Sequence, residues 1–160
     1  RKMIIPTGFN KANPLHWLAY GFGSGFAPKA PGTFGTLAAL ILYLPMAQLP
    51  LLIYCGVVLV AFLAGIWICG RTAVQLGIHD PGGIVWDEFV GLWITLIAVP
   101  GGWYGVVSGF VLFRLLDILK PWPIKWADKR VEGGLGIMLD DVLAGIIASL
   151  CLHGASLLRL

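Results

Sequence analysis

The chain has 160 residues, of which 58% are hydrophobic and only 12% are charged, and its formal net charge is +3. Soluble globular proteins carry about 25% charged residues, so this composition excludes an ordinary soluble domain. The mean hydropathy of +0.87 indicates an integral membrane protein. Two stretches, residues 30–70 and 89–113, contain no charged side chain. Because a membrane-spanning helix needs roughly 20 apolar residues, these stretches must contain several spans.

The N-terminal part, residues 1–32, is too polar and too rich in glycine and proline to span a bilayer. Asn13 and Pro14 form a helix-start signal ahead of aromatic and aliphatic residues. We therefore expect residues 13–20 to form a helix that lies along the membrane interface.

A glycine-rich segment, residues 21–36, leads into the first apolar helix. Such a loop can turn backbone N–H groups toward an anion, and a helix N-terminus adds a favourable dipole. Thr33 or Thr36 would cap this helix, and Lys29 would add a full positive charge. The alternative is a flexible entry loop with no binding role.

Prolines and glycines divide the apolar stretches into helices. Pro45 and Pro50 suit a tight turn between antiparallel helices, and Pro100-Gly101-Gly102 is a strong helix terminator. The chain is therefore predicted to be a single all-α domain, residues 1–160: a polytopic membrane protein with about five transmembrane helices plus the interfacial helix. The expected spans are residues 33–48, 50–70, 84–99, 103–119 and 140–158.

The break at residues 100–102 decides the topology. An uninterrupted helix would put Asp87 and Asp117 on opposite faces of the membrane, whereas a break brings them to the same face. With the break, every acidic residue and every basic residue except Arg159 lies on one side or at its boundary. Lys and Arg concentrate on the cytoplasmic side of membranes, so we expect this face to be cytoplasmic.

The third expected span is short. From Trp86 to Val99 an α-helix would cover about 21 Å, against a hydrocarbon core of about 30 Å. This length predicts that Asp87 and Glu88, at the start of the span, lie slightly below the headgroup plane.

One membrane face therefore gathers many carboxylates among basic side chains. The acidic residues are Asp80, Asp87, Glu88, Asp117, Asp128, Glu132, Asp140 and Asp141. Carboxylates at facing helix ends repel one another unless a hard cation lies among them, and Mg²⁺ prefers oxygen ligands completed by water and phosphate. Basic side chains nearby suit a phosphate group. The pattern therefore indicates metal-assisted phosphoryl chemistry at this face.

Each of these elements also has a simpler interpretation. Asp87 and the pair Asp140-Asp141 would cap helices and complement their dipoles. Arg114 and Asp117 would form an intrahelical ion pair. The basic residues between Lys125 and Arg130 would bind anionic lipid. The conjunction of three acidic motifs at three expected helix ends favours the metal site.

Four blocks of the sequence resemble the signature blocks of the phosphatidylglycerophosphatase A family. They are residues 21–36, 79–91, 113–124 and 134–145. The resemblance implies an enzyme of the bacterial inner membrane. Together with the expected spans and the distribution of basic residues, this predicts a multi-pass enzyme with its active site on the cytoplasmic face. The resemblance further implies removal of the terminal phosphate from phosphatidylglycerophosphate, which gives phosphatidylglycerol, with Mg²⁺ as cofactor.

The resemblance also suggests a role for each site residue. Residues with catalytic roles would be Asp87, Glu88, Asp117 and Asp141. Metal ligands would be Asp80, Asp87, Glu88, Asp117, Asp140 and Asp141. Phosphate oxygens would be held by Lys29, Thr33, Arg114 and Lys120. Two other classes compete with this hypothesis: a small cation transporter or channel subunit, and a lipid-binding scaffold without turnover.

Overall fold

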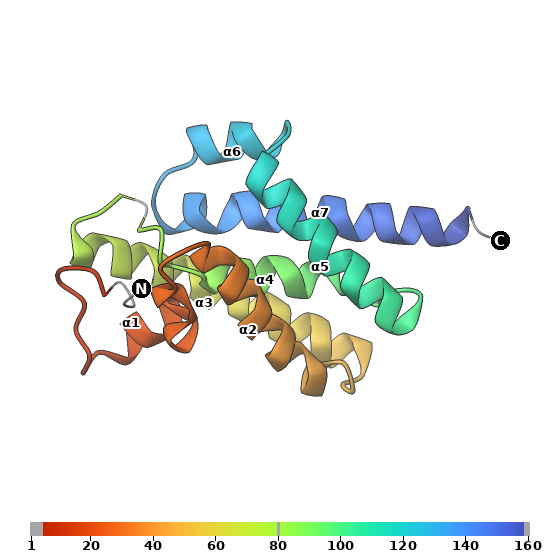
Figure 1. Ribbon diagram of the computed structural model, residues 1–160, viewed down its shortest axis with the longest axis horizontal. Helices are drawn as coiled ribbons and strands as arrows, with labels where there is room; N and C mark the ends of the chain where they lie inside the picture. Colours follow the sequence, from red (N-terminus) through yellow and green to blue (C-terminus); the bar gives the residue numbers. More distant parts are fainter. Residues whose placement is uncertain (1–4, 80, 159–160) are drawn as a thin grey trace.

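A computed structural model of the protein describes residues 5–79 and 81–158, and within these ranges the regular structure is helical, with no strand (Figure 1). The helices in chain order are α1 (Pro14–Ala19), the 3-10 segment η1 (Gly21–Phe26), α2 (Pro31–Met46), α3 (Leu51–Leu76), α4 (Trp86–Thr95), α5 (Gly102–Leu119), α6 (Ile124–Arg130) and α7 (Gly133–Leu157). The prediction of an all-α fold is confirmed.

Three of these helices are long and apolar enough to cross a membrane: α3, α5 and α7, with 26, 18 and 25 residues. At 1.5 Å per residue they are roughly 39, 27 and 38 Å long, which matches a hydrocarbon core of about 30 Å. Helix α2 is also apolar but has only 16 residues. The fold is therefore that of a membrane protein, while the count of five spans stays a prediction.

The predicted helix near the N-terminus is present as α1. The Asn13 side chain accepts a hydrogen bond from the N–H of Leu15, and Pro14 occupies the first helical turn. His16 is buried and its Nε2 lies 2.8 Å from Oε1 of Gln75 on α3. The short helix is thus fixed to the end of α3.

Helix α2 begins at Pro31, earlier than a helix capped by Thr33 or Thr36 would begin. Pro31 occupies its first turn, after Ala30 in the left-handed region at φ 49°. Thr33 and Thr36 therefore lie inside the helix, and the Thr36 hydroxyl donates to the Gly32 carbonyl. The prediction that either threonine caps this helix is wrong, because proline at the first helical position already fixes where the helix starts.

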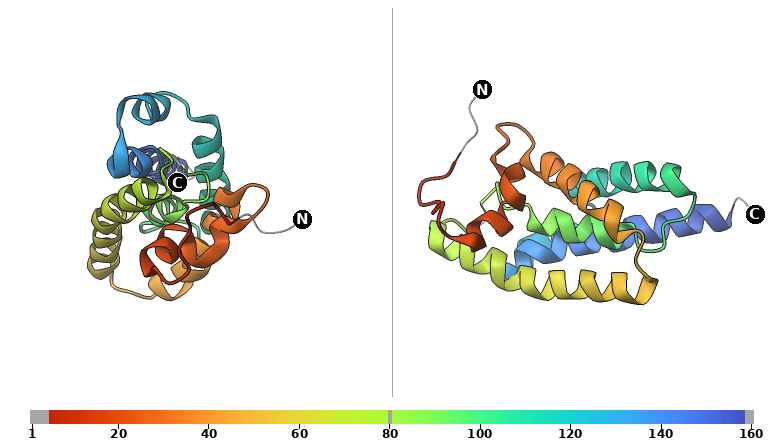
Figure 2. Two further views of the ribbon diagram at one scale, coloured as in Figure 1. Left: turned by 90° about the vertical axis from the view of Figure 1, so that its left-hand side faces the viewer. Right: turned by 90° about the horizontal axis from the view of Figure 1, so that it is seen from below.

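The third predicted span is a ten-residue helix, α4, rather than a helix over residues 84–99. It is roughly 15 Å long and mostly buried, because it packs against α2, α3, α5 and α7. The end-on view of Figure 2 shows these helices around it. Indole N–H groups of Trp86 and Trp93 donate to the carbonyls of Ala61 and Ala39, which fixes α4 against α3 and α2.

The break after α4 is confirmed. Helix α4 ends at Thr95 and α5 starts at Gly102, with Ala98 and Gly101 in left-handed conformations between them. The chain therefore reverses, and the end of α5 returns to the start of α4. This reversal brings Arg114 beside Glu88.

Helix α7 begins at Gly133, seven residues before the predicted start at Asp140. Glycine disfavours helices, so the pattern of residues 133–136 does not predict one. Tertiary packing outweighs this preference, since a Cβ at Gly134 would overlap the Ile66 carbonyl of α3. Asp140 and Asp141 therefore lie in the third turn of α7, and their interpretation as helix caps is wrong.

The polar segment after α5 also contains a helix that the sequence does not predict. Helix α6 buries Ile124 and Ala127 and packs against α7. Its lysine and arginine side chains, Lys125, Lys129 and Arg130, are exposed.

Helices α4 and α7 cross at two glycines. A Cβ at Gly145 would overlap the Gly91 carbonyl, and a Cβ at Gly91 would lie 2.9 Å from the Asp141 carbonyl. Small residues at helix interfaces in membranes allow such close backbone approach. The crossing sets how far Asp141 on α7 lies from the acidic pair on α4.

We predict that Gly145→Ala lowers stability by about 1–3 kcal/mol, because the added methyl group forces α4 and α7 apart. Thermal unfolding in detergent micelles would measure this. Gly154→Ala on the same helix is the matched control, because a Cβ there meets no atom within 4 Å. An unchanged unfolding temperature for Gly145→Ala would contradict the close crossing.

Candidate active site

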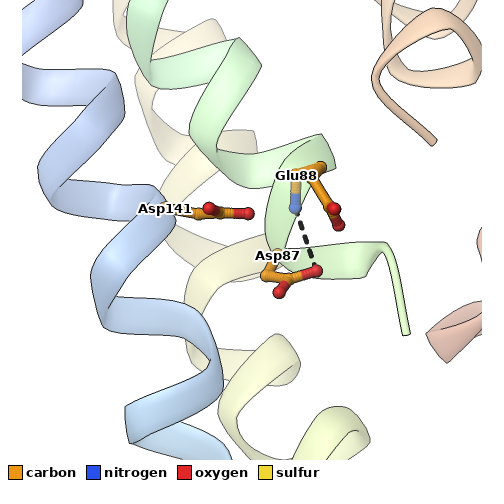
Figure 3. A group of neighbouring side chains, drawn as sticks. All are labelled: Asp87, Glu88 and Asp141. Carbon is orange, nitrogen blue, oxygen red and sulfur yellow. Dashed lines mark hydrogen bonds between the residues drawn. The ribbon is translucent and has the colours of Figure 1, made fainter. Parts of the chain in front are cut away.

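Three helices bring five carboxylates together. Asp87 and Glu88 lie in the first turn of α4, Asp117 in the last turn of α5, and the remaining two in the third turn of α7. Two groups result, in each of which one oxygen per residue lies within 4.8 Å of the others. The groups are Asp87, Glu88 and Asp141, and Asp117, Asp140 and Asp141. Figure 3 shows Asp141 directed from α7 toward the pair on α4.

These carboxylates line a cavity of about 340 Å³. Its remaining wall comes from His79, the 81–84 segment, the end of α5, α6 and the first turns of α7. Glu88, Asp140 and Asp141 are only 9%, 7% and 2% exposed. Burying several negative charges at this density is costly unless cations compensate them.

Arg114 is the first compensating cation. Its Nη1 lies 2.5 Å from Oδ2 of Asp117 and 3.8 Å from Oε1 of Glu88, and all three side chains are largely buried. The intrahelical ion pair is therefore real, but it also joins α5 to α4. Arg114 is not among the residues that line the cavity, so this contact positions the two carboxylates from behind.

Gly32, near the start of α2, lies against this ion pair. A Cβ at this position would overlap the Glu88 carboxylate and lie 3.0 Å from Arg114. Only glycine leaves room for the pair, so the first turn of α2 forms one wall of the cluster.

Lys120 is the second cation, and it does line the cavity. Its ammonium group donates to Asp140 and, at 2.9 Å, to Asp128 of α6. Burial disfavours the charged form of Lys120, but these hydrogen bonds outweigh burial and hold its pKa above the usual range. Lys120 therefore carries a positive charge next to the carboxylates.

The structure brings together most of the predicted site residues. The cluster contains Asp87, Glu88, Asp117, Asp140, Asp141, Arg114 and Lys120. Lys29 is exposed and Thr33 is half-buried, and neither is among the residues lining the cavity. Their assignment to phosphate binding stays a prediction. Asp80, predicted as a metal ligand, lies outside the described residues.

Sequence reasoning gave no specific site role to two contributors, Asp128 and Gly32. Asp128 belongs to a run of basic residues that fits a lipid-binding surface, and nothing in its spacing from Lys120 signals a contact across the turn. Gly32 has no side chain that could indicate a functional role. The glycine-rich character of residues 21–36 is a signal of close approach, but it does not identify which side chain approaches.

The donor set fits a hard divalent cation. It consists of carboxylate oxygens, and two of these, Oε2 of Glu88 and Oδ1 of Asp140, are buried with no hydrogen-bond partner among the described residues. Mg²⁺ takes such ligands together with water and phosphate oxygens. Asp87 does not cap α4, because Val85 occupies the N-cap position; Asp87 lies in the first turn, where its Oδ1 accepts from the Glu88 N–H at 3.1 Å.

The fold and the cluster define a class: a helical membrane protein with a carboxylate-rich cavity suited to metal-assisted phosphoryl chemistry. The sequence profile of the family described as Phosphatidylglycerophosphatase A matches residues 17–156. The chain belongs to the phosphatidylglycerophosphatase A family.

Individual relatives agree with this assignment. A protein of Escherichia coli (strain K12) named Phosphatidylglycerophosphatase A is 49% identical over 149 residues, which cover 92% of this chain and 87% of that protein. A protein of the same name from Haemophilus influenzae is 49% identical, covering 85% of each chain. A Bacteroides thetaiotaomicron relative, 45% identical over 79% of this chain and 83% of its own length, carries the provisional name phosphatidylinositol-3-phosphatase. No solved structure matches the chain.

We predict that Arg114→Gln destabilises the fold by on the order of 3 kcal/mol, because it leaves Glu88 and Asp117 buried without their cation. Thermal unfolding in detergent would report the loss. Arg71→Gln on α3 removes an exposed arginine and serves as the control. Equal unfolding temperatures for the two variants would show that the ion pair does not hold α4 and α5 together.

Proposed function

We propose that the protein hydrolyses phosphatidylglycerophosphate to phosphatidylglycerol and phosphate, using Mg²⁺ held by the carboxylate cluster. The observation that carries this proposal is the convergence of carboxylates from α4, α5 and α7 on one cavity with Lys120 in its wall. Membership of the phosphatidylglycerophosphatase A family supports the substrate, because close relatives carry that name.

The reaction adds water across the ester P–O bond, and the glycerol oxygen leaves with a proton. Mg²⁺ in the cluster would polarise the phosphoryl group and neutralise its charge. Lys120 would contact the phosphate oxygens, since it is the cation in the cavity wall. One of the carboxylates would accept the proton of the attacking water or attack phosphorus directly, and the candidates are Asp87, Glu88, Asp117 and Asp141.

Arg114 would act differently from its predicted role as a phosphate ligand. It contacts Glu88 and Asp117 from outside the cavity wall, so we infer that it orients these carboxylates. Charge-assisted contacts of this kind fix a carboxylate in one direction before the substrate arrives. Such preorganisation avoids reorganisation of charge during the reaction.

We further propose that the enzyme lies in the bacterial inner membrane with the cavity on the cytoplasmic face. The concentration of Lys and Arg beside the cavity supports this orientation. The exposed basic side chains of α6 would face the anionic headgroups of that leaflet.

Phosphate release from phosphatidylglycerophosphate in detergent micelles tests the function. We expect turnover with Mg²⁺, loss of turnover on chelation, and recovery when Mg²⁺ is restored. Phosphatidylinositol 3-phosphate serves as the competing substrate, because one relative carries a provisional name for it. A preference for the inositol lipid would replace the proposed substrate, and turnover unaffected by chelation would remove the metal.

Single substitutions test the carboxylates. We expect Glu88→Gln, Asp117→Asn and Asp141→Asn each to lower the rate by about 100-fold or more, because each removes a charged oxygen from the cavity. Glu132→Gln is the matched control, since Glu132 is an exposed carboxylate at the start of α7. Wild-type turnover in any of the three variants would remove that residue from the site.

A further inference from the structure

We propose that the cluster holds two divalent cations that share Asp141 as a common ligand. One cation site consists of Asp87, Glu88 and Asp141, here called site A. The other consists of Asp117, Asp140 and Asp141, here called site B. This inference rests on the proposed function, which requires a divalent cation but does not fix how many.

The two sites take their other ligands from different helices. Site A uses the first turn of α4, and site B uses the last turn of α5 together with Asp140 of α7. Asp141 belongs to both groups and is only 2% exposed. A carboxylate has two oxygens, so one side chain between two groups can serve a cation in each. The position of Asp141 therefore fits a bridging ligand.

Each site contains a buried oxygen that has no partner within the described protein. In site A it is Oε2 of Glu88, and in site B it is Oδ1 of Asp140. These residues are largely buried, at 9% and 7% exposure. A buried, charged acceptor left without a partner costs several kcal/mol or more. One unpartnered oxygen in each site indicates one ligand for each site.

The second oxygen of each of these residues faces a basic side chain. Oε1 of Glu88 lies 3.8 Å from Arg114, and Oδ2 of Asp140 accepts from Lys120. Each carboxylate thus has one oxygen beside a basic side chain and one buried oxygen without a hydrogen-bond partner among the described residues. A carboxylate with one oxygen beside a basic side chain and the other without a partner occurs once in site A and once in site B. A single bound metal ion would not require the second occurrence.

Charge also favours two cations. The five clustered carboxylates and Asp128, which also lines the cavity, face two basic side chains, Arg114 and Lys120, which leaves four negative charges uncompensated when all are ionised. A phosphate monoester adds close to two more. One divalent cation would leave a net charge of about −4 around the bound substrate, whereas two would leave about −2. Paired divalent ions are a common way in which phosphatases hold such a group.

Manganese binding provides a test that does not depend on turnover. The purified protein in phosphatidylcholine nanodiscs would be equilibrated with Mn²⁺, and the bound ions would be counted and examined by electron paramagnetic resonance. We expect two ions per chain with a spin-coupled spectrum, since a shared carboxylate keeps them close. Glu88→Gln and Asp117→Asn should each retain one uncoupled ion, and Asp141→Asn should weaken both sites at least about 10-fold.

Glu132→Gln is the control and should bind as the wild type does. Circular dichroism would establish that each variant is folded, and phosphate release would be measured on the same samples. One ion per chain with normal phosphatase activity would overturn the two-cation centre and leave the proposed function intact. Two uncoupled ions would overturn the sharing of Asp141. Two coupled ions without hydrolysis of any lipid phosphate would support the centre and overturn the function.

Discussion

The contact between Gly91 of α4 and Gly145 of α7 allows the two helices to cross without a side chain between their backbones. Because of this crossing, Asp141 lies one turn from the contact on α7 and the Asp87-Glu88 pair lies one turn from it on α4. Their carboxylates therefore meet in one cavity although 53 positions separate Glu88 from Asp141 in the sequence. A larger residue at either glycine would move the Asp141 carboxylate away from the pair on α4.

The burial of these acidic side chains depends on two basic residues at the end of α5, Arg114 and Lys120, which contact them. Arg114 lies behind the cluster and joins α5 to α4, while Lys120 terminates α5 and joins it to α6 and α7. Together they compensate part of the negative charge and leave the rest for ligands. If basic side chains compensated every carboxylate, the site would have no remaining negative charge to bind a metal cation. If no basic side chain were present, the carboxylates could not be buried. The incomplete balance is what makes the cluster suited to a metal.

The predictable part of this structure follows from strong local signals. Pro100-Gly101-Gly102 breaks a helix by backbone chemistry alone, and the break is enough to place Glu88 near Arg114. The early start of α7 was not predictable, because it depends on Gly134 packing against the Ile66 carbonyl of α3. The burial of α4 also depends on its neighbours: its composition matches a lipid-facing span, but four helices enclose it. Helix propensity depends only on the local sequence, so it does not predict contacts between helices.

The short length of α4 connects the fold to the chemistry. A full-length span would carry its first turn to the membrane surface, where water would screen the carboxylates and weaken their hold on a cation. A ten-residue helix enclosed by longer ones can hold its first turn inside the protein, at the end of the bundle where α5 and α7 supply the remaining ligands. The acidic pair therefore lies on a helix in which every residue is buried or half-buried.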